Sequence, residues 1–132
     1  MPQENVEIVR AAYPAFNRRD WDQVFSEADP EIELTVEGLP DDPGTRRGRK
    51  AAQARLEEAL AVWDAWSYEL DDLRESGEQV VALLRIRARP KGTTADIENR
   101  VGHVWTLRDG KVVSIHSFPN REQALEAAGL SE

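Results

Sequence analysis

The feature that most constrains the fold is a run of alternating apolar and polar residues that fills most of the second half of the chain. Four segments show this period of two, over residues 67–74, 79–89, 95–108 and 111–118. Turn-forming pairs separate them, at Ser76-Gly77, Lys91-Gly92 and Asp109-Gly110. Short turns between alternating runs are typical of β-hairpins. The chain is therefore predicted to contain four successive antiparallel strands.

The rest of the chain has mainly helical periodicity. A helix is predicted over residues 5–18, where one apolar stripe recurs every three or four positions, at Val6, Val9, Tyr13 and Phe16. Pro14 lacks a backbone N–H, so the helix is expected to kink or restart near Tyr13. A second long helix is predicted over 49–64, with Trp63 on its apolar face, and a last one over 121–128, ending at Gly129.

Two further elements are predicted between the long helices. Asp20 is expected to cap a short helix over 21–25, and residues 31–37 alternate as a half-buried strand. Residues 38–48 are rich in Pro, Asp and Gly and are predicted to form a loop. Helices followed by an antiparallel meander indicate an α+β fold with helices on one face of a curved sheet.

Composition narrows the classes of function. With 132 residues and neither linker nor repeat, the chain is expected to form one domain over 1–132. A net charge of −8 disfavours nucleic acid and anionic membranes as partners, and the absence of a signal peptide or long apolar run predicts a cytoplasmic protein. There is no cysteine and only two histidines, so thiol chemistry is excluded, and neither a metal nor a cofactor is expected.

The two histidines fall in the last predicted hairpin. If Asp109-Gly110 is a two-residue turn, Arg108 pairs with Lys111, and His103 then lies opposite His116. Both are predicted on the helix-covered face, although one bulge in either strand would send one of them to the other face. Two opposed imidazoles either mark a ligand site or simply satisfy buried hydrogen bonds.

A pocket is predicted around these histidines. A mostly apolar concave surface with a few convergent polar groups is typical of small-molecule sites. The side chains expected to line it come from the same sheet face and from the helical stripes, and they are Tyr13, Phe16, Trp63, Asn99, Trp105, Ser114 and Phe118.

Several segments resemble one known family. They read ENVEIVR at 4–10, AFNRRDW at 15–21, DPEIE at 29–33, HVWTLRDGK at 103–111 and EQALEAAGL at 122–130. Together they resemble the SnoaL-like branch of the nuclear transport factor 2 (NTF2-like) superfamily over nearly the whole chain. The resemblance implies a cone in which a curved, mostly antiparallel sheet and helices enclose a cavity, usually in a homodimer.

The resemblance implies a fold more specifically than a reaction. Relatives include polyketide cyclases, ketosteroid isomerase, limonene epoxide hydrolase, scytalone dehydratase and pockets without known chemistry. Ketosteroid isomerases place a base just after the first strand, where this chain has Glu37; the alternative is a solvated glutamate at a strand end. The epoxide hydrolases use Arg-x-Asp where this chain reads Arg85-Ile86-Arg87, and many relatives have an acid where it has Asn120.

Three functions follow as hypotheses. In the first, an enzyme of cyclase or isomerase type uses His103 or His116, with Glu37 as a further candidate, to move a proton next to a carbonyl in a small, largely apolar substrate. Asn99 or Tyr13 would then stabilise the developing enolate. In the second hypothesis the pocket binds the same kind of small apolar molecule, polyketide-, steroid- or terpenoid-like, but does not transform it. The third is a dimeric scaffold with a vestigial cavity.

Two other features have structural explanations. The glycines and cations of residues 44–50 lack the spacing of a phosphate-binding loop, so a basic surface patch is expected there. A homodimer is predicted through the opposite, convex face of the sheet. The charged residues of that face form either an exposed charge ladder or the rim of a homodimer interface centred on Val81, Leu83, Val104 and Ile115; they are Arg85, Arg87, Arg89, Asp96, Glu98 and Arg100.

Overall fold

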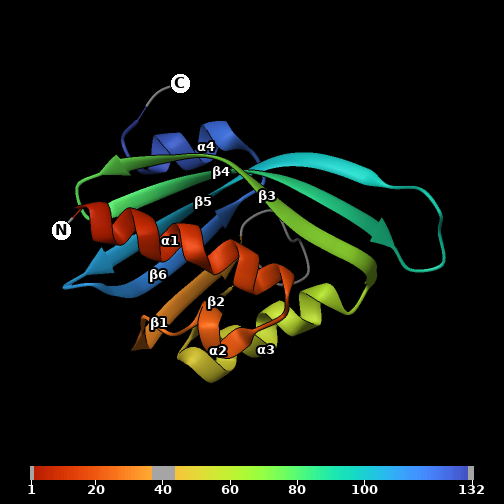
Figure 1. Ribbon diagram of the computed structural model, residues 1–132, viewed down its shortest axis with the longest axis horizontal. Helices are drawn as coiled ribbons and strands as arrows, with labels where there is room; N and C mark the ends of the chain where they lie inside the picture. Colours follow the sequence, from red (N-terminus) through yellow and green to blue (C-terminus); the bar gives the residue numbers. More distant parts are fainter. Residues whose placement is uncertain (1, 37–43, 131–132) are drawn as a thin grey trace.

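Helices precede a long antiparallel meander in the computed structural model, which describes residues 2–36 and 44–130. The helices are α1 (Pro2–Asn17), α2 (Trp21–Val24), α3 (Arg49–Leu60) and α4 (Arg121–Ala127). The strands are β1 (Ala28–Val36), β2 (Thr45–Arg47), β3 (Trp63–Ser76), β4 (Gln79–Pro90), β5 (Ile97–Arg108) and β6 (Lys111–Phe118). They form one curved sheet in the order β2-β1-β6-β5-β4-β3 (Figure 1). The predicted α+β class is confirmed.

The meander from β3 to β6 is antiparallel, as predicted, and two strands from the first half of the chain extend it. β1 pairs in parallel with β6, and the short strand β2 pairs with the other edge of β1. The prediction that 38–48 is entirely loop was wrong at β2. Contacts across the β1–β2 pair explain why these polar residues become a strand: the hydroxyls of Thr35 and Thr45 lie 2.6 Å apart, and Arg47 donates to Glu33 over 2.7 Å.

Each face of the sheet has its own apolar cluster. The inner face, which carries Val80, Leu84 and Trp105, packs with α1 in the main core. On the outer face, Val81, Leu83 and Val104 pack against α4. Figure 1 shows α4 at the top of the view, away from α1, α2 and α3. The prediction that helices cover one face only was therefore wrong.

The position of α4 also changes the predicted dimer interface. Val81, Leu83 and Val104, its expected centre, are buried beneath α4 in the same chain. Ile115 lies in the core of the inner face. The apolar centre of the predicted interface is thus not available to a second copy, and charged side chains dominate the part of the outer face next to it.

The hairpin between β4 and β5 has a longer loop than predicted. Lys91-Gly92 was expected to be the whole turn, but residues 91–96 separate the strands, and Val80 pairs with Trp105 instead of His103. β4 ends at Pro90, which has no N–H to continue the ladder. The register shifts by two residues, so every side chain keeps its predicted face.

Two helix predictions also need correction. α1 continues through Pro14 without a restart, because the buried Tyr13 and Phe16 on either side of the exposed proline hold it against the sheet. α3 ends at Leu60 and not at 64, so Trp63 begins β3, where it pairs with Pro90. No helix in the described part of the chain is long and apolar enough to cross a membrane.

Candidate functional site

A β-bulge in the last hairpin separates the two histidines. Arg108 pairs with Lys111 as predicted, but the register shifts between Thr106 and Leu107. His103 consequently pairs with Ser117, and His116 pairs with Val104 on the outer face. The predicted opposition of the histidines was wrong, and the bulge explains it, since one extra residue reverses the face of every later side chain.

His103 alone of the two histidines lies at the inner cavity. It is buried, with 7% of its surface exposed. Its Nδ1 lies 2.8 Å from the hydroxyl of Tyr13, and Nε1 of Trp105 donates to that hydroxyl over 2.8 Å. Tyr13 belongs to α1 and the other two residues to β5, so this triad joins the helix to the sheet.

The hydrogen bonds favour one protonation state of the triad. An indole N–H can only donate, so the Tyr13 oxygen accepts from Trp105. That oxygen can accept a second bond, but the Tyr13 proton has an acceptor among the described residues only when Nδ1 of His103 is unprotonated. Burial lowers the pKa of His103 to about 4 and raises the pKa of Tyr13, so both side chains are neutral at pH 7. A neutral imidazole that accepts at Nδ1 carries its proton on Nε2. That N–H has no hydrogen-bond partner among residues 2–36 and 44–130.

The triad borders a small apolar cavity of about 50 Å³. The described residues that line it are Ala12, Tyr13, Phe16, Val24, Leu34, Leu56, His103, Trp105 and Ile115. None of them is a carboxylate. Pockets for drug-sized ligands measure roughly 300–1,000 Å³. The cavity therefore accommodates a group of a few heavy atoms, and a larger ligand requires the surrounding side chains to move.

The predicted site residues are divided by the fold. Tyr13, Phe16, His103 and Trp105 meet at the cavity. Ser114 pairs with Thr106, and Phe118 stacks on His116 with ring centroids 4.2 Å apart, both away from it. The bulge in the last hairpin that moved His116 moved these two residues as well.

The other predicted residues do not line the cavity either. Asn99 keeps the inner-face register but is exposed near the start of β5, where its side chain accepts from the backbone of Arg100. Trp63 packs on Trp66 at the start of β3, with ring centroids 4.9 Å apart. Glu37 lies outside the described residues.

Tyr68 is a neighbour of the site that the sequence did not single out. Its ring lies 5.2 Å from His103 and 5.5 Å from Tyr13. Burial raises the pKa of Tyr68 to about 12, opposed by the nearby Trp66 indole and the Arg19 guanidinium. The alternation of β3 places Tyr68 on the inner face, and that pattern was the available signal.

The end of α1 positions this part of β3. The Asn17 side chain donates to the carbonyl of Tyr68 and accepts from its N–H, both over 2.9 Å. Arg19 donates to the carbonyl of Trp66 over 2.9 Å. These bonds occupy the free edge of the sheet and hold the Tyr68 ring against the triad.

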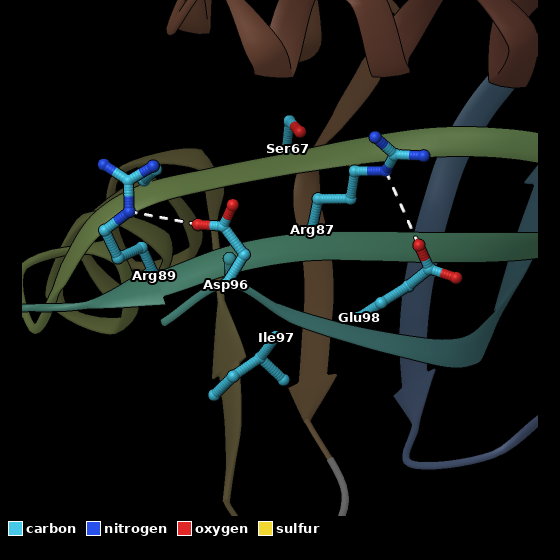
Figure 2. A pocket seen from close by; sticks show the side chains of 8 residues that line it. Ser67, Arg87, Arg89, Asp96, Ile97 and Glu98 are labelled. Carbon is cyan, nitrogen blue, oxygen red and sulfur yellow. Dashed lines mark hydrogen bonds and ion pairs between the residues drawn. The ribbon is translucent and has the colours of Figure 1, made fainter. Parts of the chain in front are cut away.

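A larger hollow lies elsewhere, where β3 and β5 begin and β4 ends, with a volume of about 440 Å³. Figure 2 shows Arg89 bound to Asp96 and Arg87 bound to Glu98, with nitrogen–oxygen distances of 3.0 and 3.6 Å. The hollow is open, and each of its arginines already has an acid beside it. The smaller inner cavity is the better candidate site because it combines apolar lining with a buried, shifted titratable group.

Comparison with known proteins identifies relatives of the whole chain. The family model described as a SnoaL-like domain matches residues 9–115. An NTF2-like protein from Burkholderia xenovorans is 30% identical, covers 97% of each chain and superposes with a TM-score of 0.75. No curated protein matches this chain significantly in sequence.

Two other solved structures share the fold. An NTF2-like protein of unknown function from Burkholderia pseudomallei is 25% identical, with 96% of each chain covered and a TM-score of 0.81. TerC, which was co-crystallised with polyporic acid, has a TM-score of 0.81 at 22% identity, with 96% of this chain and 98% of TerC covered. The fold predicted from sequence, an NTF2-like cone, is confirmed.

Proposed function

Because the chain belongs to the SnoaL-like family, we propose that it binds a small, largely apolar molecule through a carbonyl group that accepts a hydrogen bond from His103. The fold suggests a ligand-binding or an isomerase/cyclase-type domain. The observation that supports the proposal is the buried, neutral imidazole beside an otherwise apolar cavity. A hydrogen bond from this donor to a ligand acceptor, formed in exchange for one to water, contributes about 0.5–1.5 kcal/mol.

The triad prepares His103 for this role. Trp105 and Tyr13 fix the ring through Nδ1, so Nε2–H keeps one orientation without a ligand. The low pKa of His103 keeps it neutral, which avoids burying a charge when an uncharged ligand excludes water. The co-crystallisation of TerC with a small molecule supports this class of ligand.

The proposal is tested with two probes of nearly equal shape, cyclopentanone and methylenecyclopentane, both of which require the side chains around the cavity of about 50 Å³ to move. Only the ketone offers a hydrogen-bond acceptor. We expect the ketone to bind the chain about tenfold more tightly, since one hydrogen bond contributes about 1.5 kcal/mol. In His103→Phe this preference should disappear, whereas His116→Phe, on the outer face, should retain it. Equal affinity for both probes in the unchanged chain would contradict the proposal.

A second candidate function is proton transfer from the carbon next to the bound carbonyl to solvent water, which later returns a proton to the same carbon, because none of the described residues that line the cavity is a carboxylate. Neutral histidine donors stabilise a developing enolate in other enzymes. The observation that favours it here is the neutral imidazole coupled to the Tyr13 phenol in apolar surroundings. Solvent deuterium entering cyclopentanone at that carbon, faster than in buffer and lost in His103→Gln, would identify catalysis. Binding without deuterium exchange would identify a noncatalytic pocket.

The homodimer stays a prediction, but its expected interface moves from the apolar centre of the outer face to the charged part of that face. With the apolar centre covered by α4, a second copy would meet the charged part of the outer face. A catalytic role for Glu37 likewise stays a prediction.

A further inference from the structure

The outer face carries a cluster of arginines whose charges are not fully matched. It comprises Arg85 of β4, Arg87 beside it, Arg100 of β5 and Arg121 of α4, with the acids Glu69, Asp71 and Glu98. Among these named residues of the described structure, four guanidinium groups stand with three carboxylates, in a chain whose net charge is −8. The positive excess is local and does not follow from composition.

Arg85 and Arg100 are direct cross-strand partners. Like charges at opposed positions of an antiparallel pair destabilise it unless other groups offset them. Arg85 has such groups: its three guanidinium nitrogens lie 3.4 Å from Glu69, 3.5 Å from Asp71 and 3.8 Å from Glu98.

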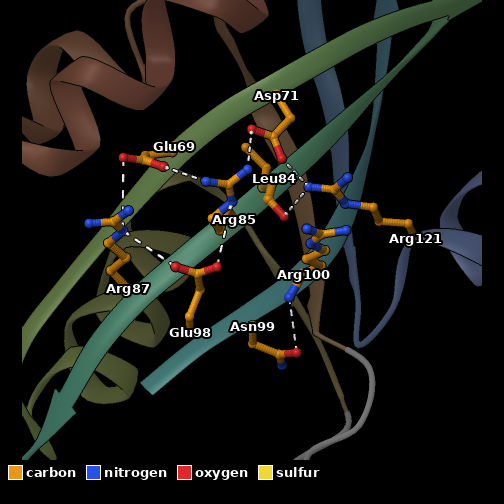
Figure 3. A network of polar contacts seen from close by, with 9 residues as sticks. All are labelled: Glu69, Asp71, Leu84, Arg85, Arg87, Glu98, Asn99, Arg100 and Arg121. Atoms are coloured by element: carbon orange, nitrogen blue, oxygen red, sulfur yellow. Dashed lines mark hydrogen bonds and ion pairs between the residues drawn. The ribbon is translucent and has the colours of Figure 1, made fainter. Parts of the chain in front are cut away.

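Arg100 differs from its neighbours. Among the described residues, its guanidinium has neither a hydrogen bond nor an ion pair. It is nevertheless close enough to Asp71 to help lower the pKa of that carboxyl, after the larger effects of Arg121 and Arg85. Figure 3 shows Arg100 and Arg121 on the same face, and the Cα of Arg121 lies 3.5 Å from where a Cβ on Gly102 would be, two positions along β5 from Arg100.

Arg121 is held in place by two hydrogen bonds. One of its terminal nitrogens donates to both Asp71 and the carbonyl of Leu84, the latter over 3.0 Å. Its side chain is 21% exposed, and its Nε is buried with no partner in the described structure. Fixed, partly buried guanidinium groups bind oxyanions better than mobile ones, since little side-chain entropy is lost.

We propose that Arg100 and Arg121 form a binding site for a small oxyanion, a carboxylate or phosphate group, on the outer face of the sheet. The anion lies between the two guanidinium groups and supplies the negative charge that the cluster lacks. Asp71 holds Arg121 in place and is itself paired with Arg85 over 3.5 Å. This site is separate from the inner cavity, so it does not depend on the function proposed there.

The test is an NMR titration with inorganic phosphate and, in a second arm, acetate. Sodium chloride keeps the ionic strength constant, so that general screening does not change. We expect saturable shifts at the Arg100 and Arg121 side-chain N–H groups, and a fivefold or greater loss of affinity in Arg100→Gln. Arg87→Gln removes one positive charge from the same face and should change affinity less than twofold. The stronger of the two arms identifies the preferred oxyanion.

Three results would overturn the site. One is the absence of saturable shifts with both anions. Another is an equal loss of anion affinity in Arg87→Gln and Arg100→Gln, which would indicate a general electrostatic attraction to the positive surface and no defined site. The third is light scattering that shows a dimer lost in Arg100→Gln, since a carboxylate from a second copy would then satisfy Arg100. Thermal unfolding of each variant checks that it is folded.

Discussion

At the scale of single residues, His103 couples stability to pH. Its pKa of about 4 in the folded chain lies below the ordinary value of 6.5. Between these values the unfolded chain binds a proton that the folded chain does not, so stability falls as pH drops from 6.5 towards 4 and changes no further below that. The full effect is about 3 kcal/mol.

Urea unfolding at several pH values measures this coupling. We expect the free energy of unfolding to fall more steeply between pH 6.5 and pH 4 in the unchanged chain than in His103→Gln. The carboxylates titrate alike in both proteins, so the difference between the curves isolates His103. Parallel curves would show that His103 is protonated as readily in the folded chain as in the unfolded one.

Tyr13 supplies the second prediction at this scale. Tyr13→Phe removes the partner of both Trp105 Nε1 and His103 Nδ1 while keeping the ring. Leaving buried polar groups unpaired should cost about 2–4 kcal/mol in the free energy of unfolding. Tyr68→Phe is the matched control, because it removes a buried phenol hydroxyl that, among the described residues, has only the Trp66 indole as a neighbouring donor and no bond to His103, and it should cost less than half as much. Equal losses of unfolding free energy in the two variants would show that the hydrogen bonds of the triad do not stabilise the fold more than any other buried tyrosine does.

The sequence predicted the members of the triad but not its geometry. Tyr13 and Trp105 were expected near His103 from helical and strand periodicity. The bond between Tyr13 and His103 spans 90 residues, and no local pattern specifies which polar atoms meet over such a separation.

At the scale of elements, Gly102 determines how α4 docks on the sheet. A Cβ added at Gly102 would lie 2.5 Å from the Cβ of Ala124. Gly102→Ala should therefore push α4 away and cost about 1–3 kcal/mol of stability. Ala124→Gly should cost about 1 kcal/mol alone, through helix propensity, yet restore part of the loss when combined with Gly102→Ala. Simple additivity in chemical unfolding of the three variants would refute the steric account.

Helices and strands were predictable where one hydrophobic period, helical or alternating, runs through the whole segment. The stripe of α1 and the alternation of β4 and β5 predicted both their type and their buried face. The bulge in β6 was harder, because Val112 and Val113 are both apolar and either could face the core. Ile115 carried the missing signal: an apolar residue there fits the inner face only if one residue is skipped.

At the scale of the whole molecule, the inner cavity is a property of packing. Its lining comes from three helices and three strands, so no single stretch of sequence determines its volume. The fold was predictable because the chain length, the order of helices and strands along the sequence, and the family resemblance agree. The site was predictable only in part, because one bulge reassigned three of its expected members, Ser114, His116 and Phe118.

A substitution that fills the cavity tests its importance. Ala12 lines the cavity from α1 and is 6% exposed. Ala12→Val adds two methyl groups to a space of about 50 Å³, so we expect stability to change by less than about 1 kcal/mol while cyclopentanone binding is lost. Ala11→Val, on the exposed side of α1, is the control and should bind normally. Calorimetric titration gives both affinities, and unchanged binding by Ala12→Val would place the ligand elsewhere.

The central claim is that His103 is a neutral Nε2–H donor facing the ligand. The most direct measurement is a proton–nitrogen NMR spectrum of the imidazole rings at pH 7, with and without cyclopentanone. We predict that His103 shows a protonated Nε2 and an accepting Nδ1, and that the ketone shifts its Nε2 resonance while His116 is unaffected. A charged His103 ring, a proton on Nδ1, or a ketone response at His116 alone would contradict the account.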